Sequence, residues 1–286
     1  MTTAYLNGDF QPLAEVRISP LDRGFLFGDG VYEVIPSYDG RPVAMQYHLE
    51  RLRHSLECIH LSSAYSEQSL RSILAALIDQ NGGGDLGIYL HISRGAEEKR
   101  QHAFSQLTTP TTFAYTFPIN KPSDGSAETA QCCRVVTARD QRWGRCHIKS
   151  TALLGNVLHM MEAVHEGAQE ALLFNDRDEL TEATTCNVFV VRSGKVLTPP
   201  LDHEKLPGVT RRQCLEFLQA HTDWIVEVRP VTRDEVLSAD EVWLTSSTKE
   251  LAPVITIDGK IVADGKPGPR WSAAQQLFHE RRFDSP

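Results

Sequence analysis

The sequence predicts a two-domain protein of the α+β and α/β classes. Its 286 residues exceed the roughly 100–200 that a single domain usually contains. Signals for antiparallel strands and amphipathic helices fill the first half, whereas strands and helices alternate through the second half. A stretch rich in Pro, Ser, Gly and charge separates the two halves. We therefore expect an N-terminal α+β domain over 1–118, a linker over 119–125 and a larger α/β domain over 126–286.

The first half is expected to form an antiparallel sheet with two packed helices. Asn7-Gly8 and Asp39-Gly40 are the commonest signals for a tight hairpin, and each joins two short runs typical of strands. Leucines and isoleucines spaced by three or four predict amphipathic helices over 48–61 and 66–80. Further strands are expected over 86–95 and 111–117.

The second half alternates between the two kinds of element. Helices are expected over about 151–167, over 211–221 and from Trp271 onward. Apolar runs bounded by turn residues predict the strands. They are expected over 134–138, 170–174, 187–191, 195–200, 225–229, 241–245 and 254–258.

Charge and composition exclude several classes of function. The formal net charge of -8 would repel a nucleic-acid backbone. No window approaches the roughly 18 apolar residues of a membrane span, and no secretory signal opens the chain. Six cysteines without a C-x-x-C pair fit the reducing cytoplasm, and no ligand spacing typical of a metal site occurs. We expect a cytoplasmic protein without a metal.

Lys149 is the first candidate for chemistry. It precedes a predicted helix and lies close in sequence to Arg142, Arg145 and His147, whose positive charges favour a neutral amine. A neutral lysine amine is a nucleophile. Because most lysines are solvated and inert, Lys149 alone is weak evidence.

Glu182 is the second candidate. It lies between two predicted strands, among threonines and close to Asn187. A carboxylate there could hold the proton of a pyridinium ring, which turns the ring into an electron sink. An exposed loop glutamate is the alternative interpretation.

The start of a predicted helix at Gly208, Val209 and Thr210 could bind an anion. Unpaired backbone N–H groups and the helix dipole favour a phosphate there, although an ordinary helix cap has the same pattern. Arg51 could add a fixed guanidinium. A solvated arginine on a helix face is the simpler account of Arg51.

Six segments occur in a fixed order along the chain. They are FGDGVYEVI (Phe27 to Ile35), HLERL (His48 to Leu52), IKS (Ile148 to Ser150), LTEATTCNVF (Leu180 to Phe189), LPGVTR (Leu206 to Arg211) and LTSSTKELAPV (Leu244 to Val254). Together they resemble the fold-type IV pyridoxal-phosphate enzymes, and most closely the D-alanine transaminases. The resemblance spans nearly the whole chain and implies a two-domain fold with the active site between the domains.

The resemblance also implies a cofactor and a reaction. Pyridoxal 5′-phosphate would form a Schiff base with Lys149, which then carries the proton, while Glu182 holds the ring nitrogen. Transamination between a D-amino acid and a 2-oxo acid, such as pyruvate or 2-oxoglutarate, would follow ping-pong kinetics. The resemblance assigns phosphate binding to Arg51, the backbone of Val209 and Thr210, and the region of Ser247 and Thr248.

Arg100 and His102 lie two residues apart on a polar loop, where a cationic pair can grip a carboxylate. They resemble the Arg-x-His carboxylate trap of D-amino acid transaminases, which reaches into the neighbouring subunit's site, with Tyr32 completing the trap. This resemblance implies a homodimer. An exposed charged loop is the alternative, and the Arg94 to Arg100 interval is one residue longer than in those enzymes.

Other departures lie close to the expected cofactor site. Ala183 stands where the family usually has Gly, Cys186 replaces Ser, and His147 replaces Asp. These changes put the polar network beside the ring and the substrate pocket in doubt. They leave Lys149 and Glu182 untouched.

Competing functions remain open. A branched-chain L-amino acid aminotransferase or an aminodeoxychorismate lyase would share the cofactor residues and differ in the substrate pocket. A thiol enzyme using Cys146 and His147 is disfavoured, because adjacent side chains on a strand face opposite ways. A binding module without catalysis would leave Lys149 free of cofactor.

Overall fold

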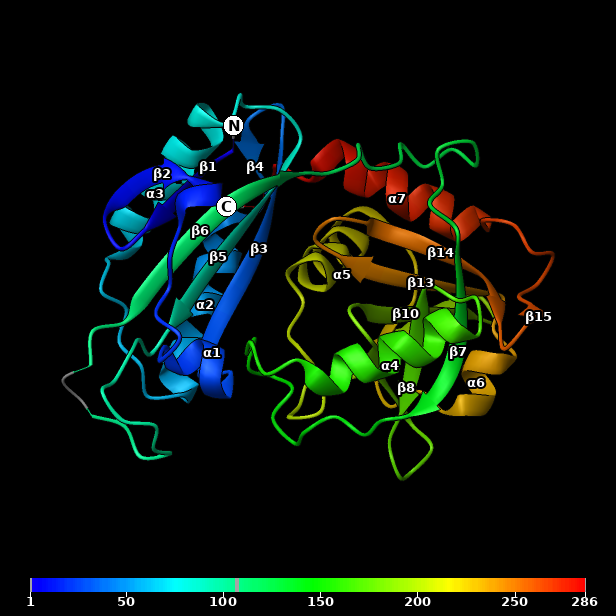
Figure 1. The fold of residues 1–286 in the computed structure, drawn as a ribbon. Coiled ribbons are helices and arrows are strands. Elements are labelled where there is room, and N and C mark those ends of the chain that lie inside the picture. Colours follow the sequence, from blue (N-terminus) through cyan, green and yellow to red (C-terminus); the bar gives the residue numbers. More distant parts are fainter. Residues whose placement is uncertain (1, 106–107, 286) are drawn as a thin grey trace. The chain divides into compact units, whose positions relative to one another are not determined.

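The computed structural model describes residues 2–105 and 108–285, which form two compact units (Figure 1). The first unit contains the described residues up to Lys121 and a short later segment, Ile148–Leu153. The second unit contains Pro122–His147 and Leu154–Ser285. Each unit is built around a sheet and has its own hydrophobic core.

The first unit contains a six-stranded antiparallel sheet in the order β2-β1-β6-β5-β3-β4. Both predicted hairpins are confirmed, with Asn7 and Asp39 in the left-handed conformation that such turns require. Its strands are β1 (Thr3–Leu6), β2 (Asp9–Pro12), β3 (Gly30–Tyr38), β4 (Arg41–Pro42), β5 (Leu86–Ser93) and β6 (Thr111–Pro118). Its helices are the 3₁₀ turn η1 (Leu13–Glu15), α1 (Arg23–Phe27), α2 (Met45–Cys58) and α3 (Glu67–Gln80).

The two longer helices of this unit pack on one face of its sheet. Leu52 of α2 and Leu77 of α3 share a core with Ile88 and Leu90 of β5. The alternating residues of β5, among them Tyr89, point to the opposite face. The amphipathic spacing of the sequence therefore predicts both helices to within a few residues.

Ile148–Leu153 packs with the first unit, although the sequence analysis assigns these residues to the second domain. The backbone N–H of Tyr32 donates to the carbonyl of Lys149 at 3.0 Å, and the N–H of Thr151 donates to the carbonyl of Gly30 at 3.0 Å. Strand β4 pairs with β3 only near its far end. The segment therefore takes up hydrogen-bonding groups at the open edge of β3.

The second unit contains a mixed nine-stranded sheet. Its order is β12-β11-β10-β13-β14-β7-β8-β9, with β15 paired to β14. The strands are β7 (Cys133–Arg139), β8 (Glu170–Phe174), β9 (Leu180–Ala183), β10 (Asn187–Arg192), β11 (Lys195–Thr198), β12 (Val226–Val228), β13 (Glu241–Ser246), β14 (Glu250–Ile257) and β15 (Lys260–Ile261). The helices are α4 (Leu154–His165), α5 (Val209–His221), α6 (Arg233–Leu237) and α7 (Pro269–Arg281).

Several elements differ from the sequence-based expectation. Helix α4 begins at Leu154, later than the expected 151, because the preceding residues pair with β3. The short elements α1, β9 and α6 were not expected, since a helix of one turn shows no periodicity. Both short helices nevertheless carry local capping signals: α6 has a capping box between Thr232 and Glu235, and α1 has Asp22 at its N-cap and a left-handed Gly28 at its end.

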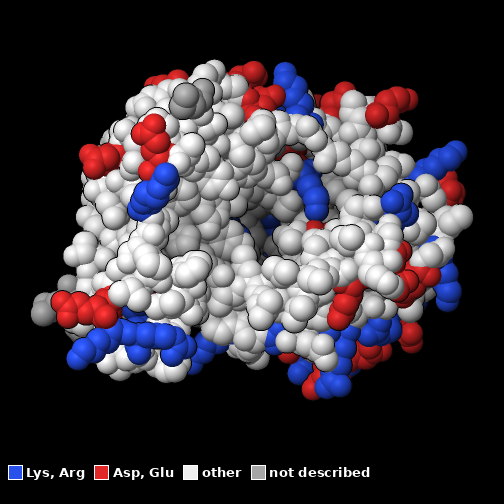
Figure 2. All heavy atoms as spheres, in the orientation of Figure 1, with Lys and Arg blue, Asp and Glu red and all other residues white. Residues whose placement is uncertain are grey.

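Acidic and basic side chains are interspersed on the face shown in Figure 2. No helix among the described residues combines the length and the apolar character needed to cross a bilayer.

Candidate active site

Lys149 lies in the first unit with its backbone fixed on both sides. Its N–H donates to the Ser55 hydroxyl at 3.2 Å, and its carbonyl accepts from Tyr32. The Nζ atom lies 4.1 Å from the centre of the Tyr32 ring. A cation over an aromatic face is attracted to it, so the Tyr32 ring holds the protonated amine in place. None of these contacts to Lys149 is with an acidic side chain.

Arg51 belongs to a buried ionic cluster beneath β3. Its Nε and Nη2 donate to the two carboxylate oxygens of Glu33 at 2.8 and 2.7 Å, and His48 Nδ1 lies 2.7 Å from the same carboxylate. Burial raises the pKa of Glu33, but the Arg51 charge and these hydrogen bonds outweigh it and bring the pKa to about 2. Burial lowers the pKa of His48. Arg51 is thus rigidly oriented by a permanent carboxylate.

Arg100 and His102 meet at one aromatic ring. The Arg100 guanidinium carbon lies 5.0 Å from the centre of the Phe27 ring, and the His102 ring centre lies 5.4 Å from it. Both side chains belong to exposed residues. Tyr32, expected to complete the trap, stacks on Tyr89 with ring centres 5.6 Å apart. The structure therefore brings two of the three predicted trap residues together.

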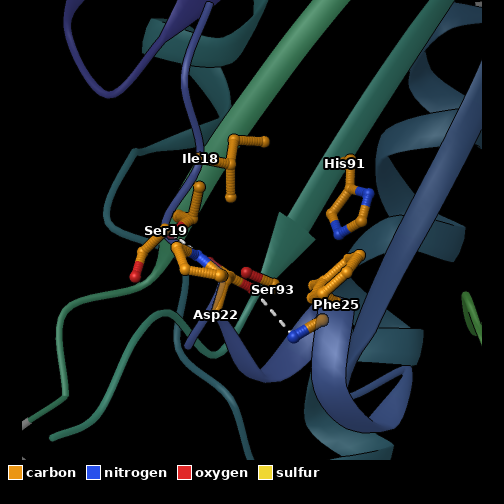
Figure 3. A pocket seen from close by; sticks show the side chains of 9 residues that line it. Ile18, Ser19, Asp22, Phe25, His91 and Ser93 are labelled. Atoms are coloured by element: carbon orange, nitrogen blue, oxygen red, sulfur yellow. Dashed lines mark hydrogen bonds between the residues drawn. The ribbon is translucent and has the colours of Figure 1, made fainter.

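A pocket of about 450 Å³ lies beside helix α1 (Figure 3). Asp22 lies at its wall and caps the helix, accepting from Gly24 N at 2.8 Å and from the Thr111 hydroxyl at 2.6 Å. His91 lines the same pocket, and burial lowers its pKa. The sequence gives no sign of this pocket. Asp22, at the wall of this pocket, fastens the start of α1 to Thr111 of β6.

Glu182 is the next-to-last residue of strand β9 in the second unit and is almost fully buried. Its Oε1 is bound by Arg142 Nη1, while its Oε2 accepts from Asn187 Nδ2 at 3.0 Å and from Leu206 N at 3.0 Å. Burial raises the pKa of Glu182, and the Arg142 charge and the Leu206 N–H oppose that rise. The result is a carboxylate in fixed orientation, able to accept from one further donor.

Arg142 binds Glu182, a role that its place in the sequence near Lys149 does not reveal. Its Nη2 lies 2.7 Å from an Asp140 oxygen, and its Nε donates to the other oxygen at 3.0 Å. The Thr181 hydroxyl also donates to Asp140, at 2.8 Å. Arg142 therefore pairs with two carboxylates, and Asp140 fixes the guanidinium that holds Glu182.

Val209 and Thr210 begin helix α5, as the sequence predicts, and both are buried. Gly208 precedes them because a Cβ atom there would lie only 1.9 Å from Asn187 Oδ1. The amide of Asn187 also donates to the Leu206 carbonyl at 2.9 Å. One asparagine therefore ties the Glu182 carboxylate to the start of a helix whose N–H groups suit an anion.

Ser247 and Thr248 form the turn between β13 and β14. The next residue, Lys249, donates from Nζ to the buried Glu170 carboxylate at 3.1 Å. The other oxygen of Glu170 accepts from the backbone of Thr185 at 3.1 Å. The ion pair links this turn to the loop that follows Glu182, a connection that the sequence did not reveal.

Cys186, one of the departures from the family pattern, lies beside this ion pair. Burial, followed by the Glu170 charge, raises the pKa of the Cys186 thiol to about 12. The thiol therefore stays protonated and packs as a small neutral group.

Comparison with known proteins identifies the family to which the sequence is similar. The sequence pattern of the class IV amino-transferases matches residues 30–257. A D-alanine aminotransferase from Bacillus licheniformis is 40% identical over 263 residues, which is 92% of this chain and 91% of that protein. A D-alanine aminotransferase from Staphylococcus epidermidis is 34% identical over 281 residues, which is 98% of both chains.

Solved structures with the same fold include branched-chain amino acid aminotransferases. The enzyme from Escherichia coli has a TM-score of 0.90 at 22% identity, covering 99% of this chain and 95% of that chain. The enzyme from Thermobaculum terrenum, in its PLP form, has a TM-score of 0.87 at 23% identity, covering 99% of this chain and 94% of that chain. The predicted fold type is therefore confirmed. At this level of identity the likeness concerns the fold alone.

Proposed function

This chain belongs to the class IV aminotransferase family, and we propose that it transfers amino groups between a D-amino acid, such as D-alanine, and a 2-oxo acid, such as pyruvate or 2-oxoglutarate. The likeness to D-alanine aminotransferases over nearly the whole chain carries the proposal. Arg100 and His102, which meet at one aromatic ring, offer donors for the carboxylate that amino acid and 2-oxo acid substrates carry.

The proposed cofactor is pyridoxal 5′-phosphate, and the donors described above fit its chemistry. Lys149 offers an amine for a covalent link, and Glu182 offers a buried carboxylate for a ring nitrogen. The start of α5, Arg51 and the turn at Ser247 and Thr248 offer groups for a phosphate. When bound, this cofactor supplies a carbonyl carbon that takes up the amino group and a ring that withdraws electrons.

The residues of this chain then hold and move protons. Lys149 Nζ would take the proton from the substrate α carbon as a general base and would then, as a general acid, donate it to the cofactor carbon that has taken up the amino group. Glu182 would keep the nitrogen of a bound ring protonated, and Arg142 opposes the rise of the Glu182 pKa that burial causes. The same groups serve the second substrate in reverse order, which gives ping-pong kinetics.

An absorbance spectrum of the purified protein tests the proposal. We expect a yellow band in the region of about 300–500 nm that D-alanine bleaches and L-leucine leaves unchanged. Bleaching by L-leucine alone would assign the chain to the branched-chain L-amino acid aminotransferases. The absence of a band with added cofactor would exclude the pyridoxal-phosphate chemistry altogether.

We also propose that the enzyme is a cytoplasmic homodimer, in which Arg100 and His102 serve the partner's site. The six cysteines are free thiols, which supports a reducing compartment. Helix α4 supports self-association, because it exposes an apolar stripe at spacings of three or four residues. The stripe consists of Leu154, Val157, Leu158, Met161 and Val164.

Replacing Leu158 by glutamate is expected to shift the protein from dimer to monomer. A charge within an apolar interface loses its hydration without gaining a partner. Light scattering after gel filtration should then give a mass close to the 32.0 kDa of one chain. Leu237→Glu is the matched control, because Leu237 lies on α6 and is exposed to a similar extent, 49% against 50%. Equal masses for both variants and the wild type would argue against the stripe as the interface.

A further inference from the structure

The loop that carries Arg100 and His102 is held through its backbone by one buried arginine. Arg23, the first residue of α1, is 4% exposed. Its Nη1 donates to the carbonyl of Gln101 at 2.7 Å, and its Nη2 donates to the carbonyl of His102 at 2.9 Å. The planar guanidinium thus grips two consecutive peptide groups at once, a geometry that a single ammonium group cannot reproduce.

The arginine is itself fixed from behind. Its Nε donates to Asp29 at 2.8 Å, and Arg94 binds the same carboxylate through Nε and Nη2 at 2.8 and 3.0 Å. Burial raises the pKa of Asp29, but the hydrogen bonds from Arg94 and Arg23 lower it by more. Asp29 therefore remains ionised, and it orients Arg23 toward the loop.

The helix that carries this arginine is also anchored. The N–H of Arg23 donates to the Gly95 carbonyl at 2.9 Å, and Asp22 caps the helix. Phe27, at the other end of α1, provides the ring on which Arg100 and His102 rest. The guanidinium carbon of Arg23 lies 4.9 Å from the same ring, so three cationic or aromatic side chains share one platform.

We propose that Arg23 is a positioning residue for recognition of the substrate carboxylate. It fixes the backbone on both sides of His102, so that Arg100 and His102 present their donors in one arrangement. The inference rests on the proposed transaminase function and on the carboxylate-binding role of those two residues.

Arg23→Met tests the proposal in the holoenzyme. The KM for D-alanine and for pyruvate is expected to rise roughly tenfold or more, the effect typical of losing a hydrogen bond made by a charged group. The kcat should change less than KM, because Arg23 contacts neither Lys149 nor Glu182 among its hydrogen bonds. Amide hydrogen exchange over residues 99–105 should accelerate, because the loop loses the hydrogen bonds from Arg23 to its backbone.

Two further variants guard against a general loss of folding. Arg23→Lys keeps a cation beside Asp29 but grips only one carbonyl, so its KM is expected to lie between those of the wild type and Arg23→Met. Arg282→Met removes a similarly buried arginine, paired with Glu250 in the second unit, and should leave the exchange of 99–105 unchanged. Retention of the cofactor band identifies the folded holoenzyme in every case.

Arg100→Ala distinguishes two ways in which the proposal could fail. Either Arg23 does not position the loop, or Arg100 and His102 do not bind the substrate carboxylate. The proposal is supported if Arg100→Ala raises KM without faster loop exchange while Arg23→Met raises both. It is overturned if Arg100→Ala raises KM and Arg23→Met behaves as the wild type. An unchanged KM in Arg100→Ala removes the carboxylate role itself and the inference with it, and a protein without a cofactor band contradicts the proposed function instead.

Discussion

Lys149→Ala is expected to abolish transamination, with a loss of at least roughly 10³-fold in the rate of the half-reaction with D-alanine. Proton transfer by a positioned side chain contributes about 10²–10⁴-fold, and this variant also loses the covalent link to the cofactor. Stopped-flow absorbance would measure the rate. The band of the purified variant should resemble free cofactor and should disappear on dialysis.

Lys149→Arg refines this experiment. Arginine keeps a cation over the Tyr32 ring, but it cannot be deprotonated in a protein and so serves neither as nucleophile nor as base. It should therefore be as inactive as Lys149→Ala while preserving the charge. Lys195→Ala, which removes a lysine paired with Glu227 on the surface, is the control with unchanged rate. A substantial rate in either Lys149 variant would contradict the assignment.

Glu182→Gln is expected to slow the half-reaction by roughly 10²–10³-fold, the range seen when one oriented electrostatic group is removed. Glutamine retains the size of the side chain and an acceptor for Leu206 N, but it cannot keep a ring nitrogen protonated. Glu179→Gln, on the turn before β9, is the matched control and should leave the rate unchanged. Full activity in Glu182→Gln would show that another group holds the ring nitrogen.

Glu182→Gln removes the titration of the Glu182 carboxyl, whereas Arg142→Met should only shift it to a different pH. Arg142 lowers the pKa of Glu182, so its loss lets burial raise that pKa further. The fraction of ionised Glu182 then falls at a given pH, and the acidic limb of the pH–rate profile is expected to shift upward. If the acidic limb of the pH–rate profile stays in place in Arg142→Met, Arg142 does not control the pKa of Glu182.

The elements that the sequence predicted well are those with repeated local signals. The hairpins at Asn7-Gly8 and Asp39-Gly40 have a fixed turn chemistry, and α2, α3 and α5 have apolar residues along one face. The start of α5 was predicted from another local pattern, Gly208 followed by Val209 and Thr210. In contrast, α1 has only five residues, too few for a periodic pattern, and besides its Asp22 cap it is held by Gly95, a contact that no local pattern encodes.

The candidate site shows the same division. Lys149, Glu182 and Arg51 stand in recognisable motifs, so the sequence could nominate them. Their partners come from distant parts of the chain: Arg142 reaches Glu182, and Glu33 reaches Arg51. Ion pairs of this kind depend on which strand lies beside which helix. Sequence spacing therefore could not reveal the groups that orient the candidate residues.

The strand-like segment Ile148–Leu153 has a consequence for how the chain is synthesised. When the ribosome has released the first 121 residues, the edge of β3 at Gly30 and Tyr32 still exposes hydrogen-bonding groups that this later segment will satisfy. Exposed strand edges invite pairing with other chains. The unit that emerges first therefore depends on residues that emerge later, and fragments that end within 119–125 would leave this edge open.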